Sequence, residues 1–364
     1  MNKNICEICL NKTSKLKISF PFFRHSDFKT HSYNLNLDKC KKCQIILNKE
    51  KRSEIENLFK KISYSKTNQT DHKVLDVIRK KKYRRTYYQC EIIYKLMKKR
   101  KKISVLDVGC FDGQLFKDLS KFFNNYEFYG YDINKNLKNK FPNRKNFNFV
   151  SGNINKISKK FDLIVMSHSI MYIKDLSNKF RSFSRLLKKD GKIYIQIPNI
   201  DTNPFYSLMG DQFQFFTKNS IKNILKLFNF RIKIINSHIF SRELIIVAEK
   251  SKFINKYKFI EDNAYEKAIL KIKKIKNNLS NIPLKSLVVM GTTVNAAFVE
   301  EILKKRIKFF VDEKISKKEI LFRNKKVINP EKLEKNDYTI LPYENNKFLL
   351  KKFQKKYKGN FYLL

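Results

Sequence analysis

The sequence predicts an α/β fold in which a seven-stranded, mostly parallel sheet with a reversed last strand lies between two smaller domains. Three observations support it. Strand-like and helix-like segments alternate from about residue 103 to residue 248, as in parallel sheets covered by helices on both faces. Two C-x2-C pairs open the chain, and a shorter strand–helix–strand pattern closes it. The 364 residues are enough for more than one hydrophobic core.

The N-terminal cysteines predict a zinc-binding domain over residues 1–50. Four thiolates can close a tetrahedron around one Zn²⁺ and leave no open position for a substrate, so a structural role is expected. His25 and His31 lie between the pairs and rank below the cysteines as ligands. The alternative is four unpaired thiols. The expected ligands are Cys6, Cys9, Cys40 and Cys43.

Residues 51–100 are predicted to be a charged helical connector with a polar break at 63–72, and the main α/β domain is expected over 101–250. Only six residues separate its last two strands. A crossover between parallel neighbours needs a dozen or more residues, so the seventh strand must be antiparallel. The strands are expected at 103–108, 126–131, 147–150, 161–166, 192–197, 231–236 and 243–248.

A lysine-rich helical linker, 251–283, is expected to lead to a C-terminal domain over 284–364. An apolar strand there ends in Gly291, and a helix and a second strand carrying Asp312 follow. A further strand is expected at 337–343. This order predicts a small Rossmann-like α/β unit.

The glycine loop after the first strand of the main domain suits a ligand without phosphate. In the stretch "DVGCFDG", Asp107 precedes the turn, and Gly109 and Gly113 are four residues apart. A dinucleotide-binding loop needs a middle glycine for the pyrophosphate, and it is absent here. Asp132 ends the second strand, where an acid suits the two hydroxyls of a ribose. S-adenosylmethionine (SAM) fits this pattern better than the dinucleotide of a dehydrogenase-like domain.

These stretches resemble the class I SAM-dependent methyltransferases. "VLDVGCFDG" is similar to the first motif of that family, and Asp132 matches its ribose-binding acid. "FVSGNIN" places Asn153 where the family usually has an aspartate near the adenine, and "FDLIVMSHSIMYIKD" matches the fourth strand and the helix after it. The resemblance implies a SAM site formed by Asp107, Gly109, Cys110, Asp112, Gly113, Asp132, Ile133, Asn153, Ile154 and Ser167.

The order of the three domains resembles the sugar C-methyltransferases, which act on nucleotide-linked keto-deoxysugars. That resemblance implies methyl transfer to a nucleotide-linked sugar in surface polysaccharide or deoxysugar biosynthesis. The polar break around Tyr64 resembles the substrate-facing segment of that family. Tyr64 is therefore a candidate site residue.

The family's general base is missing from its expected place. The resemblance implies a Tyr-x-Glu-His motif after the fifth strand, which falls on residues 209–212. Asp211 replaces the glutamate and Gln212 the histidine, and a glutamine amide cannot act as a base. Either the base has moved to His168, or the acceptor is an oxygen or nitrogen whose proton Asp211 takes, or the site is inactive. Weaker candidates for a moved base are His238 and Tyr206.

The net charge of +46 can attract phosphate-bearing or other acidic partners. One alternative function is therefore an RNA methyltransferase that grips RNA with its zinc module and basic surface. The abundance of lysine, asparagine and isoleucine along the whole chain also fits a general compositional bias with no role in binding. Nucleic acid ranks lower because the basic residues are spread along the chain and no aromatic platform accompanies them. A second alternative is a catalytically inactive SAM-binding module.

The sequence contains no apolar run of about 18 residues, as a membrane span requires. Its first residues, "MNKNICEICLNK", lack the apolar segment of a signal peptide. These features predict a cytoplasmic protein. They leave the oligomeric state open.

Overall fold

The computed structural model describes residues 4–18, 20–24, 28–30, 36–49, 74–78, 81–236, 240, 242–251, 258–283, 286–313, 315, 320–343 and 347–364. They form two compact units, each built from separate stretches of the chain. Unit 1 comprises Met1–Leu16, Asn36–Asn199 and Gln212–Asp262. Unit 2 comprises Lys17–Leu35, Ile200–Asp211 and Asn263–Leu364. The segment between the cysteine pairs thus falls in unit 2, while the five predicted domain ranges stay a prediction.

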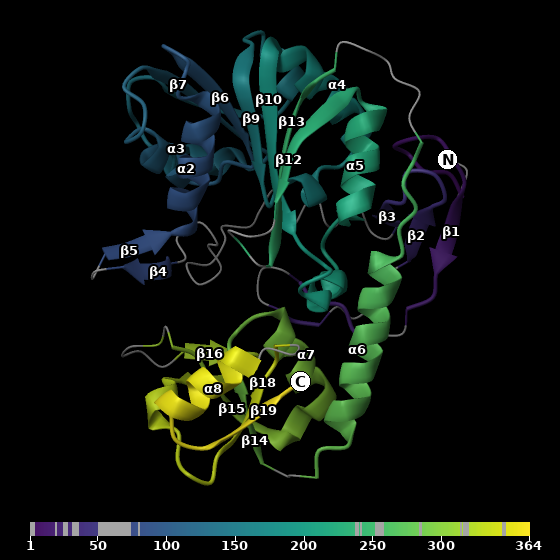
Figure 1. The fold of residues 1–364 in the computed structure, drawn as a ribbon, viewed down its shortest axis with the longest axis vertical. Coiled ribbons are helices and arrows are strands. Elements are labelled where there is room, and N and C mark those ends of the chain that lie inside the picture. Colours follow the sequence, from purple (N-terminus) through teal and green to yellow (C-terminus); the bar gives the residue numbers. More distant parts are fainter. Residues whose placement is uncertain are drawn as a thin grey trace. The chain divides into compact units, whose positions relative to one another are not determined.

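A seven-stranded sheet forms the centre of unit 1 (Figure 1). Its strand order is β12-β13-β10-β9-β6-β7-β8, and β13 runs antiparallel to both of its neighbours. The predicted fold class, with its reversed last strand, is therefore confirmed. The strands are β6 (Ile103–Val108), β7 (Tyr126–Asp132), β8 (Phe147–Ser151), β9 (Phe161–Ser167), β10 (Leu187–Pro198), β12 (Phe230–Asn236) and β13 (Glu243–Lys250).

Both faces of this sheet are covered, which explains the continuous apolar runs of its central strands. Val105 packs into one hydrophobic cluster with helices α2 and α3, and its neighbour Leu106 packs into another with α4 and α5. Consecutive side chains of a strand point to opposite faces, so the two clusters are the two layers of the core. The helices are α2 (Arg85–Met97), α3 (Gln114–Leu119), α4 (Leu176–Leu186) and α5 (Lys218–Leu227), with short 3-10 turns η2 (Lys135–Asn139), η3 (Ile154–Lys156) and η4 (Ile170–Tyr172).

The cysteine pairs belong to a small antiparallel sheet of unit 1. Its order is β1 (Thr13–Leu16), β2 (Leu37–Cys40), β3 (Ile46–Asn48) and β11 (Gln214–Phe215), so a strand that follows β10 in the chain completes it. The helical prediction for 51–100 holds in α2 only. Residues 74–78 and 81–84 instead form the antiparallel strands β4 (Val74–Ile78) and β5 (Lys81–Arg84), because β-branched residues such as those of β4 favour strands. The rest of that connector lies outside the described residues.

Unit 2 contains a six-stranded sheet in which only the edge strand β16 is antiparallel. Its order is β16 (Ile320–Phe322), β17 (Lys325–Ile328), β15 (Ile307–Val311), β14 (Leu287–Met290), β18 (Tyr338–Leu341) and β19 (Asn360–Leu363). Its helices are α6 (Ala264–Ser280), α7 (Val294–Leu303) and α8 (Lys347–Lys356), with 3-10 turns η5 (Pro204–Leu208), η6 (Lys304–Arg306) and η7 (Pro330–Lys332).

Helix α6 is a core element of unit 2 as well as a connection. Ile272, Ile275 and Leu279 recur at helical spacing and are buried in the same cluster as β14 and α7. Arg323 fastens part of the segment between the cysteine pairs to this unit, because it donates to the Phe28 carbonyl and pairs with Glu300 and Glu301 of α7. No helix in the described part of the chain is long and apolar enough to cross a membrane.

Candidate functional site

The turn between β6 and α3 can be made only with glycine at two positions. Gly109 has φ +83°, and a Cβ added to it would lie 2.5 Å from the Cβ of Ser169. Gly113 has φ +69°, and its Cβ would lie 2.7 Å from the Cδ of Pro142. Left-handed backbone and close packing each exclude a side chain. This turn, at the carboxyl ends of the parallel strands where α/β sheets bind ligands, therefore requires glycine at both positions.

Asp132, the last residue of β7, contacts this loop. Its carboxylate accepts the backbone N–H of Phe111 at 3.2 Å and that of Asn134 at 3.0 Å. Burial raises the pKa of Asp132. Ile133, the next residue, exposes 41% of its surface. An acid held in place beside an exposed apolar side chain is suited to bind a ribose and the face of a base.

The remaining residues predicted for the cofactor lie at the carboxyl ends of strands β6 and β9 or in the loops at the same edge of the sheet. Asn153 is exposed and caps η3 by accepting the N–H of Asn155 at 3.0 Å. Asp112 accepts the N–H of Gln114 at 3.2 Å, and Ser167 accepts the amide of Gln89 at 2.7 Å. Three predicted residues are buried, namely Asp107, Cys110 and Ile154. Their contact with a cofactor stays a prediction.

A buried polar cluster lies at this edge, where β9 and β10 end and β13 begins. Glu243, the first residue of β13, is 4% exposed. Its Oε1 pairs with Arg85, its Oε2 accepts the amide of Gln196, and Nε2 of His168 lies 3.1 Å from that same oxygen. His168 has φ +53°, an uncommon conformation for a residue with a side chain.

The charges around Glu243 keep it ionised despite its burial. Burial acts to raise the pKa of Glu243, but His168 and Arg85 outweigh it and lower that pKa to about 2. His168 was predicted from the sequence, whereas the other members of this cluster were not. A signal was available: a glutamate opens the otherwise apolar stretch "ELIIVA", and a charge at the start of a buried strand needs a partner.

The other predicted catalytic residues are not drawn into this cluster. Asp211 is fully buried and belongs to unit 2, whereas Gln212 is 5% exposed and belongs to unit 1. The Gln212 carbonyl accepts the side-chain amide of Asn48 at 3.0 Å, so its backbone anchors the small antiparallel sheet. Tyr64 and His238 lie outside the described residues, as do His25 and His31.

The four N-terminal cysteines come together as the spacing predicts. Their Sγ atoms all lie within 4.8 Å of one another, with Cys6–Cys43 at 3.8 Å and Cys9–Cys40 at 3.4 Å. Ligands 2.3 Å from a tetrahedral Zn²⁺ stand about 3.8 Å apart. The backbone N–H groups of Lys42 and Cys43 point at the Cys40 sulfur, each at 3.4 Å. Side-chain hydrogen bonding from Cys43 lowers the pKa of Cys40 to about 7. This donor set fits one zinc ion.

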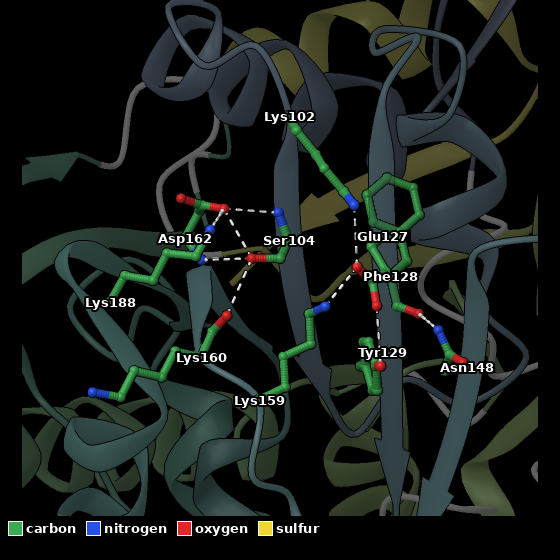
Figure 2. A network of polar contacts seen from close by, with 10 residues as sticks. All are labelled: Lys102, Ser104, Glu127, Phe128, Tyr129, Asn148, Lys159, Lys160, Asp162 and Lys188. Carbon is green, nitrogen blue, oxygen red and sulfur yellow. Dashed lines mark hydrogen bonds and ion pairs between the residues drawn. The ribbon is translucent and has the colours of Figure 1, made fainter.

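The opposite, amino-terminal edge of the sheet holds a different polar network (Figure 2). Asp162 at the start of β9 accepts Ser104 and Lys188, at 2.8 and 2.7 Å. Glu127 at the start of β7 pairs with Lys102 and Lys159. Asp162 ties β6, β9 and β10 together where they begin. This network braces the sheet on the side away from the glycine loop.

Comparison with known proteins identifies the domain that carries the loop. Residues 81–233 match the family model described as a methyltransferase domain. A SAM-dependent methyltransferase from Clostridium acetobutylicum is 15% identical over 44% of this chain and 90% of its own, with a TM-score of 0.35. The magnesium protoporphyrin IX methyltransferase of Synechocystis with bound S-adenosylhomocysteine is 14% identical over 55% and 99%, with a TM-score of 0.42. Likeness at these TM-scores says nothing about substrate. No curated protein matches the sequence.

Proposed function

We propose that this SAM-dependent methyltransferase transfers its methyl group to a sugar carried on a nucleotide. The observation that carries the proposal is the order of parts on one chain: a four-cysteine cluster, a methyltransferase domain and a second α/β sheet. This order resembles the sugar C-methyltransferases. A strongly basic chain, with a net charge of +46, also favours an acceptor that carries a diphosphate over a neutral one.

SAM supplies an activated methyl group when it is bound. The Asp132 carboxylate is suited to accept the ribose hydroxyls, and the exposed Ile133 is suited to pack on the adenine. Gly109 and Gly113 set the conformation of the turn against which the methionine end is proposed to lie. The role of the protein is then to hold donor and acceptor in line, which can supply much of the acceleration of a transfer from an already reactive sulfonium.

The zinc site is proposed to be structural. All four ligand positions are taken by Cys6, Cys9, Cys40 and Cys43, so no position stays open for substrate. The cluster joins the loop before β1 to the hairpin of β2 and β3. Zinc binding is expected to hold these strands together.

Two measurements test the function. Calorimetry with S-adenosylhomocysteine should show binding to the purified chain. Transfer of labelled methyl from SAM should then be measured to a dTDP-linked keto-deoxysugar, with structured RNA as the competing acceptor. We expect label in the sugar and none in RNA. Label in RNA, with binding that weakens steeply as salt rises, would replace the sugar by RNA as acceptor.

A further inference from the structure

We infer that His168 takes the proton of the methyl acceptor and that Glu243 is a positioning residue that holds the His168 ring for this step. The inference rests on the proposed function and deepens it, because it assigns the base that Gln212 cannot provide. Three points support it: the position of His168 beside the glycine loop, the contacts that fix the Glu243 carboxylate, and the ability of a histidine paired with a carboxylate to accept a proton.

His168 lies beside the cofactor loop. It follows Ser167 at the carboxyl end of β9, and the next residue, Ser169, packs directly against Gly109. The His168 backbone N–H donates to the Gln196 carbonyl at 2.8 Å, which fixes its left-handed backbone between β9 and β10. Such strained residues persist where the surrounding structure holds them, and they gather at functional sites. The side chain is 17% exposed, so it is not sealed in the core.

Polar side chains of β10 and α2 fix the position of the Glu243 carboxylate. Tyr194 and Gln89 each donate to the Gln196 amide oxygen at 2.7 Å. Since that oxygen is occupied by two donors, the amide nitrogen of Gln196 must face Glu243 and donate to it. Arg85 balances the charge on the other carboxylate oxygen. Nε2 of His168 is buried and lies 3.1 Å from Oε2 of this carboxylate, an ion-pair distance without the alignment of a hydrogen bond.

A neutral histidine whose Nε2–H points at a carboxylate leaves Nδ1 as a free acceptor, and the carboxylate stabilises the imidazolium that forms. In the proposed step, Nδ1 takes the proton from the acceptor X–H. The X–H electron pair then forms the bond to the methyl carbon. The carbon–sulfur pair returns to sulfur, and the products are X–CH₃, neutral S-adenosylhomocysteine and protonated His168. The step balances without any further reactant.

The test compares wild type with His168→Asn, Glu243→Gln and the matched control Glu249→Gln, which makes the same change later on strand β13. Because Glu243→Gln leaves buried Arg85 without a countercharge, a fourth variant combines it with Arg85→Gln. Methyl transfer from SAM to a dTDP-linked keto-deoxysugar gives kcat and KM, and calorimetry gives the affinity for S-adenosylhomocysteine. Nitrogen-15 NMR reports which ring nitrogen of His168 carries the proton.

We expect His168→Asn to lower kcat by about 10²–10⁴-fold, the usual contribution of a general base, with cofactor affinity unchanged. Glu243→Gln, alone or with Arg85→Gln, should lower kcat by up to ~10⁴-fold and remove the single Nε2–H form expected in wild type. Glu249→Gln should change neither. Values of kcat within twofold of wild type in the His168 and Glu243 variants would overturn the inference.

If the methyl acceptor is not a sugar, the same experiments give a different set of results. In that case wild type binds S-adenosylhomocysteine but methylates no sugar, and the NMR comparison still decides the role of Glu243. A His168 ring that keeps one protonated nitrogen in wild type and loses that preference in Glu243→Gln supports the positioning role. An unchanged ring in both Glu243 variants rejects it.

Discussion

The two sheets of this protein share a local pattern but differ in what they build from it. In unit 1, β6 leads through Gly109 and Gly113 to a helix, and β7 then ends at Asp132. In unit 2, β14 leads through Gly291 to helix α7, and Asp312 follows β15. Each is a strand, a glycine turn, a helix, and a second strand with an acid at its carboxyl end.

The packing around the glycines separates the two loops. A Cβ on Gly109 would lie 2.5 Å from Ser169, whereas a Cβ on Gly291 would meet only the Tyr343 hydroxyl, at 3.3 Å. The acids differ too. Asp132 accepts backbone N–H groups, while Asp312 accepts the hydroxyl of Thr292 in its own loop, at 2.9 Å. The strand–glycine–helix pattern therefore marks a turn in both units, and the packing around the glycines and the partners of the acids distinguish the two turns.

The largest expected difference between the units is their response to metal loss. Among the described residues, the four-cysteine group is the one set suited to a metal, and it lies in unit 1. Cys40→Ser should remove zinc and expose the amides of β1 to β3 to hydrogen exchange, because structural zinc contributes about 10–16 kcal/mol in small domains. The amides of β14, β15 and β18 in unit 2 should stay protected.

Metal analysis of the purified protein should give about one zinc per chain, as one tetrahedral site requires. Cys90→Ser, at a buried cysteine outside the cluster, is the matched control and should retain the metal. Protein prepared without chelator that contains no zinc would reject the site.

The glycines themselves give the next largest contrast. Gly109→Ala forces a left-handed alanine against Ser169 and should cost about 2–5 kcal/mol, the sum of backbone strain and overpacking. Gly291→Ala has a similar φ of +88° but more room, so backbone strain of about 1–2 kcal/mol is expected. Thermal unfolding and calorimetry with S-adenosylhomocysteine measure both effects. If the two variants lost the same amount of S-adenosylhomocysteine affinity, the proposal that only the Gly109 loop binds the cofactor would be wrong.

Acid should weaken unit 1 through Glu243. The pKa of Glu243 is lowered to about 2 from an ordinary value of 4.5. A lowered pKa means that the stabilisation is complete above about pH 4.5 and is lost as the pH falls toward 2. Its size is on the order of 3 kcal/mol. Unfolding of wild type and Glu243→Gln followed across this range should show a difference that shrinks as the pH falls.

Glu313 in unit 2 is the matched control for that experiment. Burial acts to raise its pKa, but Tyr357 and Lys356 lower it, and its side chain is 40% exposed. Solvent screens such a pair, so Glu313→Gln should change the acid response much less. If Glu313→Gln changed the pH dependence of unfolding more than Glu243→Gln does, the expected order of the two effects would be wrong.

The sequence was sufficient to predict the main sheet because its signals are local. All seven predicted strands of that sheet are present, and the six-residue link before Glu243 forced the last strand to be antiparallel. Strands β4 and β5 were not predicted, because the high charge of residues 51–100 favoured a helical connector over the β-branched residues of β4. Strand β11 could not be foreseen, since two residues become a strand only by pairing with β3.

The same distinction between local and long-range signals applies to the residues of the candidate site. The turn glycines and Asp132 are marked by their spacing. The pairing of His168 with Glu243 joins residues 75 positions apart, and Arg85 and Gln196 come from two further elements. No spacing rule connects four such residues. The division of the chain into units is equally non-local, because unit 2 takes in Lys17–Leu35 from between the cysteine pairs.

The smallest effect is the one that bears most directly on which loop holds the cofactor. Asp132→Ala would leave ribose hydroxyls without their acceptor and should weaken S-adenosylhomocysteine binding by about 1–3 kcal/mol, or about 5- to 150-fold. Asp312→Ala makes the same change at the matching position of unit 2, where the carboxylate already accepts Thr292, and should leave the affinity as it is. Calorimetry on both variants gives the answer. A loss of affinity in Asp312→Ala that equals the loss in Asp132→Ala would mean that both loops take part in binding, and that packing around a glycine is no guide to which turn becomes a site.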